Sequence, residues 1–359
     1  MFGEMECEVS AMKRYCILVT GANGFIGTNL VSLLLRQGNQ IIALDRAAQR
    51  CRYTEYRCAV DACRQTDFDL LMINGDIRNQ EMLQEKIFCY EIDYVIHLAA
   101  LSTVQMGTED EEETLSINVT GTETLLGIVR DYGRIRGFLY ASTDKVYGKL
   151  RKNVYRESDP LNPIDSPYDR SKAQADEMVR RWSHQYQLHG IVLRFCNVYG
   201  EYDLQSTRII PGSIKALLEN RPCTLRVYRD EEGIIQNYKR EFLYVGDLCE
   251  GIWDIIKILD TWNQEPDAAN VGWGEAFNLG AKQCWSIGEV VEKLEKIIGR
   301  TYPPRVEESG GVPEIEEQCM DYGKAEQYFH FMPKTSFEEG LNRTAAWWRE
   351  QLEEDSYGQ

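Results

Sequence analysis

An α/β fold built around a parallel sheet is the architecture that this sequence of 359 residues predicts. Short apolar runs recur along its first half, a glycine-rich turn follows the first of them, and an amphipathic helical pattern follows the turn. Alternation of strands and helices places parallel strands in one sheet, with helices on both of its faces.

The N-terminal part of the sequence has the element order of a dinucleotide-binding unit. The apolar run 15–20 is typical of a buried strand, and the glycine turn 21–27 leads into a helix that should end near Gly38. A second strand, 41–44, ends at Asp45. Because strand, glycine turn, helix, strand and acid follow in this order, we predict a Rossmann-type, doubly wound parallel sheet.

Each glycine of the turn has a physical task in binding a pyrophosphate. Gly21 permits the tight turn, Gly24 lets the backbone approach the phosphates, and Gly27 lets the helix pack closely on the strand. Free N–H groups at the helix N-terminus, where Phe25 and Ile26 lie, would hold the phosphates. A glycine-rich turn can also be a turn and nothing more, but the flanking strands and the acid favour a cofactor site.

The acid at the end of the second strand favours NAD over NADP. Asp45 can accept hydrogen bonds from both adenosine ribose hydroxyls, and it would repel a 2′-phosphate. Arg46 beside it weakens this inference. At the end of a later buried strand, Leu98 is followed by Ala99 and Ala100, whose small side chains would let the chain pass close to the cofactor. We therefore predict NAD as the cofactor.

A strand-end hydroxyl group and a Tyr–Lys pair form the second candidate site. The run 138–141 is typical of a strand and is followed by Ser142 and Thr143. Tyr168 and Lys172 open a predicted helix and share one face of it. The ammonium of Lys172 and a positive nicotinamide should together lower the pKa of Tyr168 and make it a usable base. The spacing alone arises by chance in many proteins, but here it accompanies a dinucleotide motif.

Composition restricts the class of partner. There are 40 Lys and Arg against 57 Asp and Glu, a formal charge of −17, which argues against a protein that binds nucleic acid or an anionic membrane, because both need a basic face. No apolar run approaches the roughly 20 residues of a membrane-spanning helix. Eleven cysteines without paired spacing indicate reduced thiols in a cytoplasm. His97 has no His or Cys at ligand spacing, so we predict a packed strand residue and no metal site.

Together these motifs resemble the extended short-chain dehydrogenase/reductase family, which comprises NAD-dependent epimerases and dehydratases. The resemblance rests on the spacing G-x-x-G-x-x-G at 21–27, the Tyr-x-x-x-Lys pair, and the run Arg-Glu-Phe-Leu-Tyr-Val-Gly-Asp at 240–247. It extends from Lys13 to about Glu350. It implies a smaller C-terminal α/β lobe for the substrate, and a homodimer formed through the helix after the Asn-x-x-Gly-Thr segment at 118–122.

The family plan divides the chain into three parts. Residues 1–12 would be an N-terminal extension, and residues 13–200 the NAD-binding domain that also holds the catalytic residues. Residues 201–350 would form mainly the substrate-binding lobe, while a segment at about 240–265 returns to the NAD-binding domain.

The run Ser-Thr-Asp-Lys-Val-Tyr-Gly at 142–148 resembles, more narrowly, the nucleotide-sugar 4,6-dehydratases. Many of these have Thr-Asp-Glu at this place, and a subset has Asp-Lys. They oxidise sugar carbon 4, eliminate water across carbons 5 and 6, and return hydride to carbon 6, which gives a 4-keto-6-deoxy sugar nucleotide.

The resemblance assigns a role to each residue at this strand end. Thr143 would bind the 4-hydroxyl group, Asp144 would protonate the departing 6-hydroxyl group, and Lys145 would remove the proton from carbon 5. Asp144 would have to be protonated, which requires desolvation. Lys145 would have to be neutral, and we expect burial beside other cations to favour that form.

The remaining assignments concern the nucleotide and the substrate. A diphosphate needs local cations even on an acidic protein, because charge-assisted hydrogen bonds act at contact distance. One feature departs from the family: the stretch 314–321 lacks the arginine that Thr-Asp-Glu dehydratases usually have there, and this puts the identity of the substrate in doubt. The predicted residues are Asp76 and Ile77 at the adenine ring, and Ser102, Asn197, Arg208 and Arg240 at the substrate.

Two other functions remain open. If Lys145 only pairs with Asp144, the protein would be a nucleotide-sugar 4-epimerase or 4-dehydrogenase of the same family. The chain would instead be a silent NAD-binding sensor or scaffold if it turned over no substrate. The intact Tyr168, Lys172 and Asp144 count against this last reading.

Overall fold

The computed structural model describes residues 13–46, 57–60, 68–102, 110–150, 153–264, 272–308 and 314–357. The predicted N-terminal extension, residues 1–12, lies outside these ranges. Within them, none of the helices combines the length and the apolar character that crossing a membrane requires.

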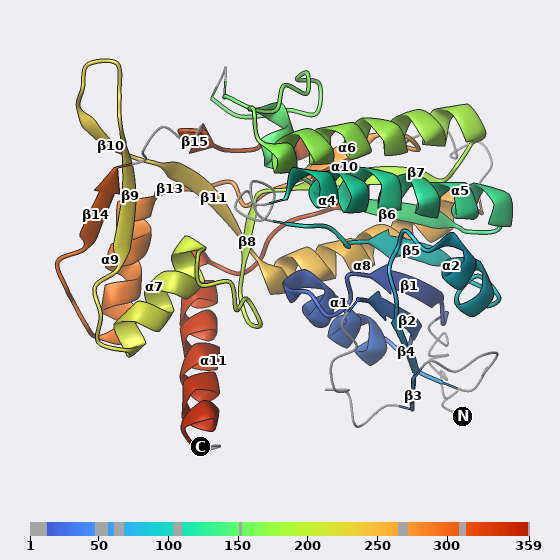
Figure 1. Ribbon diagram of the computed structural model, residues 1–359, viewed down its shortest axis with the longest axis horizontal. Helices are drawn as coiled ribbons and strands as arrows, with labels where there is room; N and C mark the ends of the chain where they lie inside the picture. Colours follow the sequence, from blue (N-terminus) through green and yellow to red (C-terminus); the bar gives the residue numbers. More distant parts are fainter. Residues whose placement is uncertain are drawn as a thin grey trace, which may run out of the picture.

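A parallel sheet of eight strands forms the centre of the fold (Figure 1), which confirms the predicted fold class. The strand order is β12-β7-β6-β5-β1-β2-β4-β3, and every pairing in it is parallel. The chain therefore winds outward in both directions from β1. The strands are β1 (Cys16–Thr20), β2 (Gln40–Asp45), β3 (Cys58–Val60), β4 (Leu70–Asn74), β5 (Tyr94–His97), β6 (Gly137–Thr143), β7 (Gly190–Phe195) and β12 (Ala276–Leu279).

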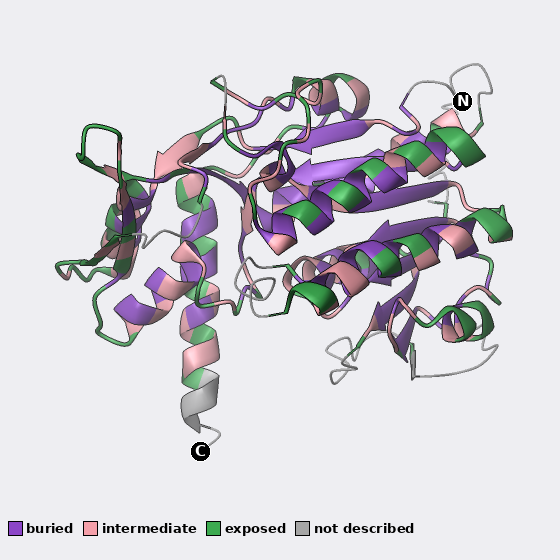
Figure 2. Ribbon diagram, turned by 45° about the horizontal axis from the view of Figure 1, so that its top comes forward, coloured by how far each residue is buried: buried purple, intermediate pink, exposed green. Residues whose placement is uncertain are grey.

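The sheet is buried on both faces because helices cover each of them (Figures 1 and 2). In β1, Ile17 packs in a core with α1 and α8, whereas Leu18 packs in a second core with α5 and α6, as alternation along a strand requires. This explains why the strands are continuous apolar runs. The covering helices are α1 (Phe25–Arg36), α2 (Gln80–Lys86), α4 (Glu111–Leu115), α5 (Thr122–Tyr132), α6 (Pro167–Tyr186) and α8 (Val245–Trp262).

A π-helical segment, η1 (Ser116–Gly121), joins α4 to α5 and contains the Asn-x-x-Gly-Thr run except for its last residue, Thr122, which begins α5. Asn118 is fully buried there, and its amide group exchanges hydrogen bonds with the backbone of Leu101 and donates to Ser171 on α6. His97 is likewise a packed strand residue, as predicted, because Thr20 and Thr122 contact its two ring nitrogens.

The C-terminal part of the chain builds two smaller sheets beside the first (Figure 1). One has the order β10-β9-β14; in the other, β11 is flanked by β13 and β15 and also pairs with β8. The division of the chain into two domains at about residue 200 stays a prediction. Helix α8, which covers most of the segment predicted to return to the NAD-binding domain, does lie beside α1. The elements are β8 (Asn197–Tyr199), α7 (Ile209–Leu218), β9 (Thr224–Arg229), β10 (Ile235–Asn237), β11 (Lys239–Tyr244), β13 (Cys284–Ser286), α9 (Ile287–Ile298), β14 (Arg305–Glu308), β15 (Glu317–Gln318), α10 (Gly323–Phe329) and α11 (Phe337–Tyr357).

A buried ion pair attaches α6 to the sheet. Arg194 on β7 donates from Nε and Nη2 to the two carboxylate oxygens of Asp176 on α6, at 2.9 and 2.8 Å, and both side chains are fully buried. Arg194 also donates to the hydroxyl of Tyr147, and Ser142 at the end of β6 donates to Asp176. The first turn of α6 is thus held in a defined place relative to the end of β6.

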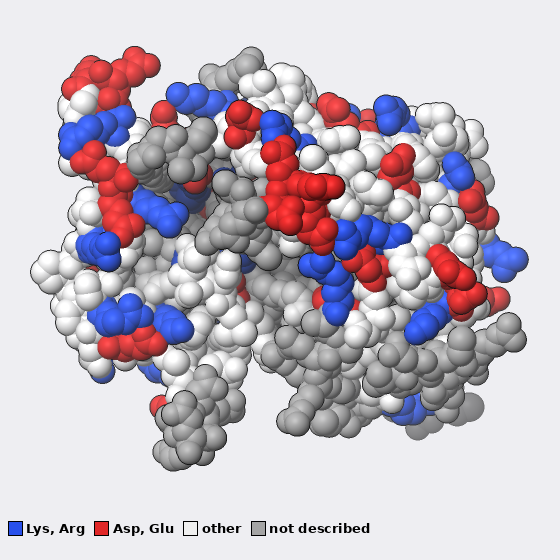
Figure 3. All heavy atoms as spheres, viewed as in Figure 1, with Lys and Arg blue, Asp and Glu red and all other residues white. Residues whose placement is uncertain are grey.

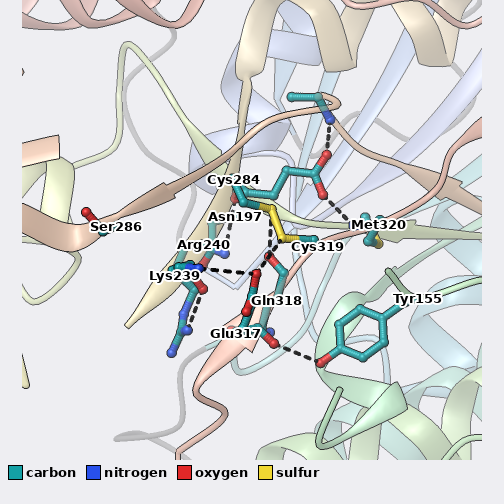
Figure 4. The surroundings of a disulfide bond; sticks show 12 residues. Tyr155, Asn197, Lys239, Arg240, Cys284, Ser286, Glu317, Gln318, Cys319 and Met320 are labelled. Atoms are coloured by element: carbon teal, nitrogen blue, oxygen red, sulfur yellow. Dashed lines mark hydrogen bonds and ion pairs between the residues drawn. A yellow bond between two sulfur atoms is a disulfide. The ribbon is translucent and has the colours of Figure 1, made fainter. Parts of the chain in front are cut away.

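The expectation of reduced thiols throughout is wrong for one pair of cysteines. Cys284 on β13 and Cys319, directly after β15, form a disulfide with a Cα–Cα distance of 6.1 Å (Figure 4). They are 35 residues apart, and only the pairing of β13 and β15 with β11 between them brings the two together. Cys16, Cys196 and Cys249 are buried thiols.

Replacing Asp176 by asparagine should destabilise the protein strongly, because Arg194 would keep its charge in the core without a counter-ion. We expect a loss of about 3–5 kcal/mol in the free energy of unfolding, measured by urea denaturation. The matched control is Asp131→Asn, which removes an exposed pair with Arg130 and should leave the midpoint nearly unchanged. Equal stability of the two variants would contradict the structural role of the buried pair.

Candidate active site

One cleft of about 1130 Å³ runs between the carboxyl ends of the parallel strands and the C-terminal part of the chain. Parallel strands place their carboxyl ends at one edge of a sheet, where α/β proteins bind ligands. All the predicted site residues line this cleft: Gly21, Gly24, Phe25, Ile26, Gly27, Asp45, Arg46, Asp76, Ile77, Leu98, Ala99, Ala100, Ser102, Thr143, Asp144, Lys145, Tyr168, Lys172, Asn197, Arg208 and Arg240.

The glycine turn has the geometry that a bound pyrophosphate requires. Gly21 has a φ of +69°, and a Cβ there would lie 2.8 Å from the backbone nitrogen of Ala99. A Cβ on Gly27 would lie 2.2 Å from the carbonyl oxygen of Gly21. Gly24 begins α1 without a side-chain cap, so the first N–H groups of this 12-residue helix face the cleft without side-chain acceptors. The residues present therefore fit a dinucleotide.

Next to Asp45, the basic side chains that line or border the cleft form ion pairs with acidic side chains that the sequence motif does not include. Arg46 forms an ion pair with Glu113 on α4 at 3.3 Å, and Arg78 contacts the same carboxylate at 2.7 Å. Arg78 also binds Asp76, and its hydrogen bonds lower the pKa of that carboxyl group. Figure 3 shows acidic side chains gathered over α4 next to basic ones. Arg46 thus has an acidic partner, which it shares with Arg78.

Tyr168 and Lys172 lie on one face of α6, as predicted, and both are buried. The ammonium of Lys172 donates to the carbonyl oxygen of Ala141 on β6 and lies 4.3 Å from the ring centre of Tyr140. Burial lowers the pKa of Lys172 to about 7. The predicted lowering of the Tyr168 pKa is not found in the chain alone: burial, and secondarily Asp169, raise it. The desolvation of the phenol outweighs the attraction of nearby cations.

At the end of β6, Thr143 caps the short helix η2 (Asp144–Tyr147) and orients the acid that follows. Its hydroxyl accepts from the backbone N–H of Lys145 and donates to Oδ1 of Asp144 at 3.1 Å. Within the described residues, Oδ2 of Asp144 has no hydrogen-bond partner, and the side chain is 3% exposed. Burial raises the pKa of Asp144 to about 6, although Lys145 opposes this effect. This is the desolvation that a proton-donating carboxyl group requires.

Lys145 has a different neighbour from the one expected. Its ammonium lies 3.2 Å from Oε1 of Glu314, so an anion is in direct contact with it, and the nearby cation Arg240 is bound to the same oxygen atom. The carboxylate that accepts its hydrogen bond is Glu314 and not Asp144. An anionic contact stabilises the charged form, which is the reverse of what a neutral base requires.

Both arginines chosen for the diphosphate are already paired with acids. Arg240 on β11 donates to Glu314 at 3.0 Å, and Arg208 at the start of α7 donates to Asp203 at 3.2 Å. Asn197 on β8 donates to the carbonyl oxygen of Glu241. A diphosphate in this part of the cleft would therefore compete with carboxylates for its cations.

Two carboxyl groups near the predicted catalytic residues were missed from the sequence. Asp169 is fully buried, neither of its oxygens has a hydrogen-bond partner within the described residues, and burial raises its pKa to about 7. It lies inside the Tyr-x-x-x-Lys motif, so its position was a usable signal. Glu314 is 169 residues from Lys145, and no local pattern connects the two.

Replacing Asp144 by asparagine should stabilise the apoprotein at pH 7. The folded-state pKa of Asp144 lies near 6, above the unfolded value, so the unfolding free energy falls as pH rises from about 4 to 6. The ionised, buried carboxylate then costs about 2–3 kcal/mol, which Asp144→Asn should recover. Urea denaturation at pH 4 and pH 7 would measure this gain, which should nearly vanish at pH 4. An exposed control, Asp165→Asn, should show no such pattern; a variant less stable than the parent at pH 7 would contradict the prediction.

Known proteins resemble this chain along most of its length. Residues 18–344 match the family model for GDP-mannose 4,6 dehydratase. A UDP-glucuronate 4-epimerase of Thermodesulfobacterium geofontis is 29% identical over 94% of this chain and 97% of its own. The low-salt glycan biosynthesis protein Agl12 of Haloferax volcanii is 31% identical over 90% of this chain and 96% of its own.

A solved structure also resembles this chain along most of its length. The dTDP-glucose 4,6-dehydratase DesIV of Streptomyces venezuelae, crystallised with NAD, superimposes with a TM-score of 0.78 at 29% identity, over 94% of this chain and 98% of that one. The chain therefore belongs to the GDP-mannose 4,6 dehydratase family and, with these relatives, to the extended short-chain dehydrogenases/reductases, the NAD-dependent epimerases and dehydratases.

Proposed function

We propose that this protein is an NAD-dependent nucleotide-sugar 4,6-dehydratase. The observation that supports this most directly is Asp144, a buried carboxyl group with a raised pKa at the end of β6, beside Thr143 and in the same cleft as Tyr168. Oxidation and re-reduction at carbon 4 alone need only a hydroxyl group, Tyr and Lys. A buried carboxyl group whose pKa is raised toward neutrality suits the protonation of a departing hydroxyl group.

Each of the predicted site residues has a distinct role in the proposed reaction. Thr143 would bind the 4-hydroxyl group, and Tyr168 would take its proton. NAD+, when bound, would supply the hydride acceptor and a positive charge. Lys145, once neutral, removes the proton from carbon 5, and Asp144 protonates the hydroxyl group that leaves carbon 6. Asn197, Arg208 and Arg240 hold the diphosphate.

An epimerase is the second candidate, and one observation favours it. Glu314 holds the ammonium of Lys145, and a charged lysine cannot act as the base that dehydration needs. The 29% identity to a UDP-glucuronate 4-epimerase points the same way. A homodimer and a cytoplasmic location remain predictions, as does the division of the chain into domains.

Incubation with a panel of UDP-, dTDP- and GDP-hexoses, followed by mass spectrometry, separates the two candidates. We expect loss of one water from at least one member of the panel. Lys145→Ala should abolish the exchange of solvent deuterium into carbon 5, because the proposal assigns the removal of that proton to the amine of Lys145. Lys149→Ala, a surface lysine nearby, is the matched control. Epimers without any loss of water would exclude the dehydratase.

The ion pairs of Glu113 should contribute to the choice of NAD over NADP. Glu113→Gln would free the charge of Arg46 for a 2′-phosphate, so we expect the ratio of NADP to NAD affinity to rise by about 5- to 10-fold. Titration of both cofactors by calorimetry measures this ratio. Glu112→Gln removes a charge from the same turn of α4 and should change the ratio less; equal effects of both variants would contradict the role given to Glu113.

A further inference from the structure

A single carboxylate oxygen connects the proposed base with the proposed diphosphate site. Oε1 of Glu314 accepts from Nζ of Lys145 at 3.2 Å and from Nη2 of Arg240 at 3.0 Å. The three side chains come from distant segments: η2, β11 and the stretch that precedes β15. All three line the cleft, and the side chains of Lys145 and Arg240 are 17% and 10% exposed.

Glu314 is ionised in this arrangement. Burial alone would raise its pKa, but the charges of Lys145 and Arg240 outweigh burial and lower it. The other ionisable groups that act on this cluster are Asp144 on η2 and Asp169 on α6. Among these carboxyl groups, Glu314 is the one whose side chain is in direct contact with the ammonium of Lys145.

Arg240 cannot serve Glu314 and a diphosphate equally well. A diphosphate bound to this guanidinium would place its negative charge next to the carboxylate of Glu314, and like charges at contact distance repel strongly in a partly buried site. Binding of the diphosphate must therefore weaken the contact between Glu314 and Arg240. The same oxygen atom, Oε1 of Glu314, also accepts a hydrogen bond from Lys145.

We propose that Glu314 is a positioning residue that holds Lys145 as an ammonium group in the free enzyme and yields Arg240 to the diphosphate of the incoming nucleotide sugar. To act as the base at carbon 5, Lys145 must leave this carboxylate, release its proton to the solvent of the open cleft, and use the freed lone pair to take the proton from carbon 5. The step at carbon 5 rests on the proposed function, whereas the competition for Arg240 does not.

Two measurements on Glu314→Gln test the proposal. Calorimetric titration with UDP and with dTDP should show binding that is about 5- to 10-fold tighter than in the parent, because the competing charge is gone. Solvent deuterium exchange at carbon 5 should persist, because Glu314 does not itself take that proton. Glu314→Asp keeps the charge and should resemble the parent. Glu316→Gln removes a charge two residues away, on a side chain that pairs with Lys149, and is the matched control.

The outcomes are distinct. Loss of exchange in Glu314→Gln at every pH, with exchange retained in Glu314→Asp, would show that Glu314 is itself the base and would overturn the proposal. Unchanged affinity for both nucleoside diphosphates would overturn the competition for Arg240. If the parent enzyme dehydrates no sugar, the dehydratase assignment fails, and the binding measurement alone then decides whether Glu314 and the diphosphate compete.

Discussion

The ion pair of Arg194 and Asp176 is the interaction on which the geometry of this site depends most. It attaches α6 to β7 in the interior, and Ser142 and Tyr147 extend the same network to the end of β6. Burying two charges costs desolvation energy, which the multiple hydrogen bonds offset. Because of this network, the helix that carries Tyr168 and Lys172 has a defined position relative to the strand end that carries Thr143 and Asp144.

The electrostatics of the cleft follow from a second constraint, the excess of acidic residues. The cations that would meet an anionic ligand are paired in advance: Arg46 with Glu113, Arg208 with Asp203, and Arg240 with Glu314. Each pairing lowers the attraction for anions in general. A ligand gains affinity only where its groups replace these carboxylates or reach the N-terminus of α1, so pairing favours a ligand with two well-spaced anionic groups over a free phosphate.

Burial determines the acid–base properties of the proposed catalytic groups. It raises the pKa of Asp144 toward neutrality and lowers that of Lys172 to about 7, and it raises that of Tyr168 well above its usual value. The motif was expected to produce a phenol that ionises easily, yet the chain alone produces the opposite, since a low-dielectric environment opposes any isolated charge. The cleft is therefore arranged so that a positively charged cofactor and the catalytic groups function together.

The sequence by itself determined the parallel sheet, the glycine turn and the predicted site residues, all of which line the cleft. Those features depend on local spacing: apolar runs form buried strands, Gly21 and Gly27 are required by close backbone contacts, and parallel strands end at one edge. Only the tertiary structure decided which charges meet. The contacts of Glu314 with Lys145, Glu113 with Arg46, and Cys284 with Cys319 join residues far apart in the chain, and no local pattern encodes such distances. The pKa values follow from the same cause, because burial is a property of the folded chain.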